Sequence, residues 1–258
     1  MFLVVALAMI AILFEPVRQF VTEEPVEEGW FLSVAYTTMN PDRPGLGVTD
    51  YPGNLVADIP KGYAMVLMAE LERDRHGIAP DLSNLAKASG DWLLANASLD
   101  PSGRVGWGVP VAWDAYGDDS VNPSNTVYSI STGIVAGALL DWMESDPDAP
   151  AEEILTVVEA ALDGFAQEAV RTPSGLVPYS LVATDGAYDT FNSAAYIAGE
   201  MQRFAKYAST PEAGERLRDA ADDTVRSLID HRHLSPAGAW YWQYSVQEDV
   251  TNDLAHAA

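Results

Sequence analysis

Acidic side chains gather in three long segments of the sequence, residues 103–125, 175–192 and 238–252. The carboxylates of these segments, with one more at the helix start that follows, are Asp114, Asp118, Asp119, Asp185, Asp189, Glu248, Asp249 and Asp253. Cleavage of a glycosidic bond requires one protonated and one ionised carboxyl beside the bond. Asp114 and Asp189 have aromatic neighbours, and desolvation by such neighbours favours the protonated form of a carboxyl. These two are therefore the candidate acid–base pair, while several of the others suit solvated turns or a helix start.

A histidine and three tyrosines give a second candidate set. His256 could act with Tyr179, Tyr188 or Tyr244. A neutral His or an ionised Tyr can remove the proton beside a uronate carboxylate while a Tyr donates one, which is the chemistry of a lyase or an epimerase. Arg104 is the only cation in the three segments, which is little positive charge for an anionic polymer. His256 also suits a packing role in a buried helix, so both interpretations stay open.

Aromatic residues are dense in the same segments. They are Trp107, Trp113, Tyr116, Tyr179, Tyr188, Trp240, Tyr241, Trp242 and Tyr244. Aromatic faces beside Asp and Asn suit sugar rings, whose axial C–H bonds pack on a π surface while their hydroxyls bond to the polar groups. The candidate substrate-binding residues are Trp107, Trp113, Tyr188, Trp240, Trp242 and Asn252. The alternative for each aromatic is a place in the core beneath the segments.

The elements that must position these segments are helices. Hydrophobic periodicity predicts them at roughly 60–75, 80–97, 126–144, 150–171, 192–208 and 211–232, with a seventh starting near 252. The fourth and sixth carry one apolar stripe each, formed by Ile154, Leu155, Val158, Leu162 and Phe165 and by Leu217, Ala221, Val225, Leu228 and Ile229. The second helix is amphipathic as well. The first, third and fifth are small or apolar nearly all round, and Gly133, Gly137, Ala195 and Gly199 would let neighbours approach closely.

An alternation of enclosed and half-exposed helices predicts an inner ring and an outer ring. The expected fold is all-α, an α/α toroid of helical hairpins, with about three pairs and the start of a fourth in an incomplete ring. Asn125, Asn192 and Asn252 stand at the starts of enclosed helices and are predicted to cap them. The acidic and aromatic segments then share one face. The connections on the other face, such as "ESDPDAP" and "ASTPEAG", are short.

The sequence resembles the six-hairpin glycosidase-like toroids, a fold shared by glycoside hydrolases, polysaccharide lyases and, in a related form, glucuronyl epimerases. The resemblance rests on the hairpin period, on the loops "GWGVPVAWDAYGDD" and "GAWYWQYS", and on the helix start "NDLAHAA". It covers about residues 60–258 and implies a toroid that acts on a carbohydrate. No short motif selects one family within this group.

Composition limits the partners. The sequence has 14 Lys and Arg against 38 Asp and Glu, a formal net charge of −24, which repels a phosphate backbone, so nucleic acid is not an expected partner. The absence of cysteine excludes disulfides and thiolate metal sites. No cofactor is expected, and a structural calcium is possible but not indicated. No metal site is predicted, because His231 and His233 end an outer helix, where cations favour the helix dipole. An acid-rich, lysine-poor surface also suits concentrated salt, which suggests a halophilic source.

The two ends of the sequence set the expected domain limits. Residues 1–14 are all apolar but fall short of the ~20 residues of a bilayer-spanning helix. They predict a remnant of a signal or membrane-anchor segment, with a buried core helix as the alternative. An irregular segment is expected at 15–58 and the toroid domain at 59–258, apparently truncated at its last helix. The export interpretation places the protein outside the cytoplasm, secreted or membrane-anchored.

These features together predict a carbohydrate-active enzyme for a poly- or oligosaccharide. Hydrolysis by a carboxylate pair is favoured over Tyr/His lyase or epimerase chemistry. A non-catalytic glycan-binding or envelope scaffold protein with the same aromatic surface is the remaining alternative. The sequence does not predict the oligomeric state.

Overall fold

The structure is a computed structural model that describes residues 40, 42–49, 55–77, 84–114, 119–182, 185 and 189–247. Its helices and strands belong to one compact unit, residues 41–257. The predicted signal or anchor remnant at 1–14 and the predicted helix start near 252 lie outside the described residues. Among the residues described, no helix is both long and apolar enough to cross a membrane.

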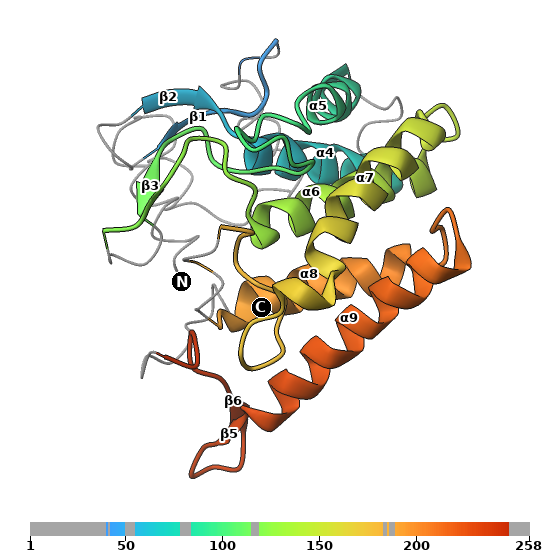
Figure 1. Cartoon of the computed structure of the whole chain (residues 1–258). Helices are drawn as coiled ribbons and strands as arrows, with labels where there is room; N and C mark the ends of the chain where they lie inside the picture. Colours follow the sequence, from blue (N-terminus) through green and yellow to red (C-terminus); the bar gives the residue numbers. More distant parts are fainter. Residues whose placement is uncertain are drawn as a thin grey trace. The chain divides into compact units, whose positions relative to one another are not determined.

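Three consecutive helical hairpins form most of the unit (Figure 1). The helices are α4 (Pro60–Arg75), α5 (Asn84–Ala95), α6 (Ser129–Ser145), α7 (Ala151–Ala166), α8 (Phe191–Phe204) and α9 (Pro211–Asp230), with a 3-10 turn η1 (Glu168–Val170) after α7. The six predicted helices that fall within the described residues are confirmed. The fourth is shorter than predicted because the chain becomes extended at Gln167.

The helices form two layers, as in an α/α toroid. The inner helices α4, α6 and α8 pack side by side in this order, and the outer helices α5, α7 and α9 pack behind them, each against its hairpin partner. α6 is buried nearly all round. A Cβ at Gly133 would lie 3.0 Å from Tyr196 Cδ1, and one at Gly137 would lie 2.9 Å from Glu200 Oε1. These two glycines therefore bring α6 and α8 close together, as predicted.

One side of α8 is open, which the sequence pattern does not predict. Ala195, Gly199 and Gln202 are exposed, and a Cβ at Gly199 would meet no atom within 4 Å. The prediction that Ala195 and Gly199 face a close neighbour is therefore wrong within the described structure. Small residues permit close packing on any side of a helix, and here only the side with Ser193, Ala194 and Ile197 is buried.

The buried stripe of α9 is rotated relative to its prediction. Leu217 and Ala221 are buried as expected, but Val225 and Ile229 are 48% and 45% exposed. Thr224 and Ser227 are buried instead, because their hydroxyls bond to the Ala220 and Ser174 carbonyls. In α7, by contrast, Ile154, Val158, Leu162 and Phe165 are buried as predicted.

Short antiparallel strand pairs connect the helices. They are β1 (Leu46–Thr49) with β2 (Leu55–Asp58), β3 (Trp113–Asp114) with β4 (Val121–Asn122), and β5 (His233–Leu234) with β6 (Trp240–Tyr241). The first pair lies within the segment that was expected to be irregular. Asp58 holds it in place by accepting hydrogen bonds from Arg43 Nε at 3.1 Å and from Tyr63 Oη at 2.7 Å.

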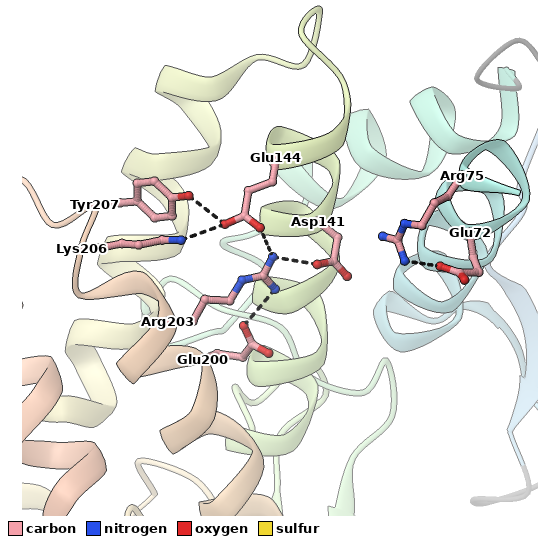
Figure 2. Close-up of polar contacts among 8 residues, drawn as sticks. All are labelled: Glu72, Arg75, Asp141, Glu144, Glu200, Arg203, Lys206 and Tyr207. Atoms are coloured by element: carbon pink, nitrogen blue, oxygen red, sulfur yellow. Dashed lines mark hydrogen bonds and ion pairs between the residues drawn. The ribbon is translucent and has the colours of Figure 1, made fainter.

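A set of charged and polar groups joins the C-terminal ends of α6 and α8 (Figure 2). This α6–α8 charge network consists of Asp141, Glu144, Glu200, Arg203, Lys206 and Tyr207. Arg203 Nη2 donates to Asp141 Oδ1 at 2.7 Å and to Glu144 Oε2 at 2.6 Å. Although burial alone would raise the pKa of Glu144, its hydrogen bonds with Arg203 and Tyr207 lower it to about 2. Burial raises the pKa of Glu200 to about 6.

Candidate functional site

Three loops meet at the N-terminal ends of α6 and α8. Loop A (residues 96–128) follows α5, loop B (167–190) follows α7 and loop C (231–247) follows α9. Loops A and B are joined by a backbone bridge between Tyr128 and Ser180, and loops B and C by one between Thr190 and Ser245. The prediction that these segments share one face is therefore confirmed for the described residues.

The inner helices α6 and α8 are each capped by a backbone carbonyl of the following loop. Ser129 N, at the start of α6, donates to the Tyr179 carbonyl at 2.8 Å, and Phe191 N, at the start of α8, donates to the Tyr244 carbonyl at 3.2 Å. These carbonyls satisfy amide groups that a helix start leaves without partners. Both carbonyls belong to a Tyr-Ser pair, so the contact repeats from one hairpin to the next.

The predicted asparagine caps are wrong for α6 and α8. The N-cap residues are Tyr128 and Thr190, and neither makes a side-chain capping bond. Asn125 lies before α6 with φ +65°, a left-handed conformation that asparagine tolerates in turns. Asn192 lies inside the first turn of α8, and Asn252 lies outside the described residues.

Two tryptophans predicted to bind substrate hold the ends of outer helices. Trp107 is 1% exposed, and its Nε1 donates to the Leu93 carbonyl in the last turn of α5 at 2.9 Å. Trp242 Nε1 donates in the same way to the Leu228 carbonyl of α9 at 2.7 Å. In loop B, Arg171 bonds to the last carbonyls of α7. This repeated contact closes each outer helix and gives both indoles a structural role.

Three aromatic rings pack together where loops A and B meet. Trp113 stands edge-on to Tyr128 with ring centroids 5.5 Å apart, and Tyr128 lies 5.2 Å from Tyr179. Tyr128 and Tyr179 are buried and Trp113 is half-buried. We call these three residues the aromatic cluster, and Trp113 is its member nearest to solvent.

A fully buried carboxylate lies beside the aromatic cluster. Asp185 is 0% exposed, and its Oδ2 accepts hydrogen bonds from Asn122 Nδ2 at 2.7 Å and Ser180 Oγ at 2.6 Å. Its Oδ1 has no hydrogen-bond partner among the described residues. Asn122 Nδ2 also donates to the Tyr128 hydroxyl at 3.1 Å. Burial, with a further contribution from Asp185, raises the pKa of Tyr128 to about 12.

A second buried carboxylate ties loop B to loop C. Asp189 is 1% exposed, and its Oδ2 accepts from Ser174 Oγ at 2.9 Å and Gln247 Nε2 at 3.0 Å. Its backbone N donates to Gln247 Oε1 and its carbonyl accepts from Val246 N. Asp189 Oδ1, like Asp185 Oδ1, lacks a partner within the part of the chain that is described.

Asp114 faces away from the aromatic cluster. In the β3–β4 pair Trp113 is opposite Asn122, and Asp114 is opposite Val121. Because successive strand residues point to opposite faces, Trp113 and Asn122 share one face and Asp114 shares the other with Val121, which is 61% exposed. Asp114 Oδ2 accepts from the Asp119 backbone N at 3.0 Å. Asp114 is therefore half-buried on the face away from the aromatic cluster, and Asp185 is fully buried.

The other predicted site residues lie apart or outside the described residues. Trp240 is 60% exposed on β6, with the Arg232 guanidinium 4.8 Å from its ring centroid. Tyr244 is half-buried and contributes its carbonyl to α8. Tyr188, His256 and Asn252 lie outside the described residues. At the end of α9, His231 Nδ1 is 2.8 Å from the Ser227 carbonyl, and no group of His, Asp and Glu in the described ranges is arranged to hold a metal.

No protein-family model matches the sequence, and no curated protein matches it. Solved structures do match. A possible family 105 glycoside hydrolase from Salmonella enterica has a TM-score of 0.57 at 16% identity, over 93% of this chain and 62% of that chain. A family 105 glycoside hydrolase from C. acetobutylicum has a TM-score of 0.52 at 12% identity, over 71% and 52%. A variant of reducing-end-xylose-releasing exo-oligoxylanase has a TM-score of 0.52 at 13% identity, over 88% and 60%.

These likenesses show the fold, which is that of an α/α toroid. The chain spans between 52% and 62% of the length of these solved structures. Their sequence identities are too low to transfer a reaction or individual residues. The function of the site must therefore be argued from its own geometry.

Proposed function

We propose that the chain acts as a carbohydrate-active enzyme that hydrolyses glycosidic bonds of an oligosaccharide. The observation that carries the proposal is the buried Asp185, which keeps one oxygen without a partner among the described residues beside the aromatic cluster. The solved structures of similar fold are glycoside hydrolases, and one exo-oligoxylanase variant, with a TM-score of 0.50, was determined with xylobiose bound. A carboxylate beside aromatic faces at the loop side of a toroid suits the same class of reaction.

Hydrolysis requires two carboxyl groups in different states. One donates its proton to the glycosidic oxygen as the C–O bond breaks, and the other activates water or attacks the sugar carbon. The described loops offer Asp114, Asp185 and Asp189 for these roles. Asp114 is half-buried, whereas Asp185 and Asp189 are fully buried and their carboxyl groups are hydrogen-bonded only through Oδ2 among the described residues. The three carboxyl groups thus differ in burial and in hydrogen bonding.

The test is to replace each of the three aspartates by asparagine. Reducing ends released from neutral and uronate-bearing oligosaccharides are measured, together with the melting temperature. Replacement of a catalytic aspartate should lower kcat/KM about 10²–10⁴-fold while the protein stays folded. Asp91→Asn is the control, because Asp91 is exposed and pairs with Lys87 on the surface. If the wild-type chain cleaves no substrate, or all three variants keep its rate, hydrolysis is excluded.

The structure offers less support for lyase or epimerase chemistry. A pKa of about 12 keeps Tyr128 protonated, so it is unsuited to act as an ionised base. The Arg104 guanidinium is bonded to Ser102 Oγ and the Leu181 carbonyl. The same assay detects a lyase through absorbance of an unsaturated uronate product. Binding without product in all variants would instead indicate a glycan-binding scaffold.

A further inference from the structure

We infer that Tyr128, Asn122 and Asp185 form a recognition site for a hydroxyl group of a neutral sugar. This inference rests on the proposed function and names the chemical class of its ligand. It follows from three hydrogen-bonding groups whose roles are fixed by one another. We call these three residues the hydroxyl site.

The orientation of the Asn122 amide is set by its neighbours. Its Nδ2 group donates a hydrogen bond to Asp185 Oδ2 at 2.7 Å. The same nitrogen lies 3.1 Å from the Tyr128 hydroxyl oxygen. An amide nitrogen does not accept hydrogen bonds, so Tyr128 is the acceptor in this contact.

The Tyr128 hydrogen is therefore not used by Asn122. No acceptor for it is found among the described residues. Tyr128 is 1% exposed, and its phenol stays protonated throughout the neutral range. The Tyr128 hydroxyl is thus a donor without an acceptor among the described residues. A buried donor without a partner costs free energy.

Asp185 supplies the complementary acceptor. Its Oδ2 is used twice, by Asn122 and Ser180, while its Oδ1 has no partner within the described structure. A hydroxyl group can accept one hydrogen bond and donate another, so it can take the Tyr128 hydrogen and give its own to Asp185. A uronate carboxylate only accepts hydrogen bonds, so it cannot donate one to Asp185 Oδ1.

The surroundings of the site suit a sugar ring. Tyr179 and Trp113 pack around Tyr128, with ring centroids 5.2 Å and 5.5 Å from it. Aromatic faces accept the axial C–H bonds of a neutral ring. Trp113 is the half-buried member of the cluster, so its ring is the one nearest to a ligand that comes from solvent.

The inference is tested by binding to the full chain. Xylobiose, cellobiose, mannobiose and galactobiose are screened by saturation-transfer NMR, and the dissociation constant of the tightest binder is measured by calorimetry. Tyr128→Phe removes only the hydroxyl, and should weaken binding about tenfold. Tyr207→Phe is the matched control, because its hydroxyl bonds to Glu144 at the other end of the helices. It should change the dissociation constant less than twofold.

Two further comparisons separate recognition from a structural role. Deoxy analogues of the tightest binder should include one that binds the wild type and Tyr128→Phe equally, because the two changes remove the same hydrogen bond. A disaccharide with glucuronate in place of one neutral sugar should bind at least tenfold more weakly. Tyr128→Phe should raise KM more than it lowers kcat.

The outcomes distinguish this inference from the proposed hydrolysis. Neutral binding that depends on Tyr128, without product release, supports the hydroxyl site and rejects hydrolysis. Hydrolysis by the wild type, together with an unchanged dissociation constant in Tyr128→Phe, supports hydrolysis and rejects the hydroxyl site. The inference is overturned if none of the four disaccharides binds at millimolar concentration, if Tyr128→Phe binds like the wild type, or if the glucuronate disaccharide binds more tightly.

Discussion

Acidic residues occur at both ends of the inner helices α6 and α8, but their partners differ between the ends. At the C-terminal end, Asp141 and Glu144 are bonded to Arg203, and Glu144 also to Lys206 and Tyr207. At the loop end, the buried Asp185 and Asp189 are held by neutral donors, and each keeps Oδ1 without a partner among the described residues. Glu200 Oε2 also lacks a hydrogen bond, but it lies 3.6 Å from the cationic Arg203 Nη1. The difference in partners is the basis for proposing that the C-terminal end serves stability and the loop end binds the ligand.

Removal of Arg203 should have the largest effect. Arg203→Met leaves Asp141 and Glu200 of the α6–α8 charge network without a cation and Glu144 with Lys206 alone, and we expect a loss of about 3 kcal/mol in the free energy of unfolding. The loop end is untouched, so specific activity of the folded fraction should not change. Urea denaturation measures the first quantity and an oligosaccharide cleavage assay the second.

Arg226→Met provides the matched control for Arg203. Arg226 pairs with Asp222 and Asp223 on the exposed face of α9, and such surface pairs contribute less than about 1 kcal/mol. Equal losses in the two variants would show that the α6–α8 charge network is no more important than a surface pair.

A methyl group at Gly133 should affect both ends. Its Cβ would lie 3.1 Å from the Ile197 backbone Cα, and such overpacking costs about 1–3 kcal/mol. The displacement of α6 relative to α8 would also shift the loop end, so Gly133→Ala should lower activity as well as stability. Gly199→Ala is the control, because that position is open, and it should stabilise the protein by about 0.5–1 kcal/mol. A loss of stability in Gly199→Ala would show that this side of α8 is covered in solution.

Replacing Glu200 should have a smaller effect than replacing Arg203, and one that depends on pH. Burial raises its pKa from 4.5 to about 6 in the folded state, so the folded protein loses stability as the pH rises from about 4.5 through 6. Glu200→Gln removes this loss and should be about 1–2 kcal/mol more stable than the wild type above pH 7. The advantage should disappear near pH 4.5.

Glu144 should show the opposite pH dependence. Its pKa is lowered to about 2, so its contribution is present above pH 4.5 and is lost as the pH falls towards 2. Thermal melts of Glu200→Gln at pH 7.5 and 4.5, and of Glu144→Gln at pH 7.5 and about 2.5, measure the two effects. An advantage of Glu200→Gln that did not vary with pH would contradict a titrating Glu200.

The helices and their layers could be predicted because apolar spacing is a local signal. The apolar stripe of α7, which ends at Phe165, is buried as expected. The stripe of α9 could not be predicted as reliably, because Thr224 and Ser227 are buried through hydrogen bonds that no periodicity shows. The sequence does not predict the open side of α8 either, because Ala195 and Gly199 suit both a close contact and an exposed surface.

The sequence predicts which loops form the site, but not which of their residues are hydrogen-bonded to one another. The acidic and aromatic residues do meet at one face, yet the sequence does not mark Asn122 and Tyr128 as members of the hydroxyl site. Only the bridge between Tyr128 and Ser180 brings them to Asp185, and such a long-range pairing leaves no mark in a single sequence. The register of β3 and β4 likewise decides that Trp113 and Asp114 face opposite ways.

The carbonyl caps of α6 and α8 impose an order on folding during synthesis. The first amide of α6 finds its partner in Tyr179, 50 residues further along the chain, and that of α8 finds its partner in Tyr244. The N-terminal hydrogen bonding of α6 and α8 is therefore complete only after the following loop has left the ribosome. A nascent chain halted before Tyr179 should show a frayed first turn of α6, which becomes protected from amide exchange once loop B has emerged.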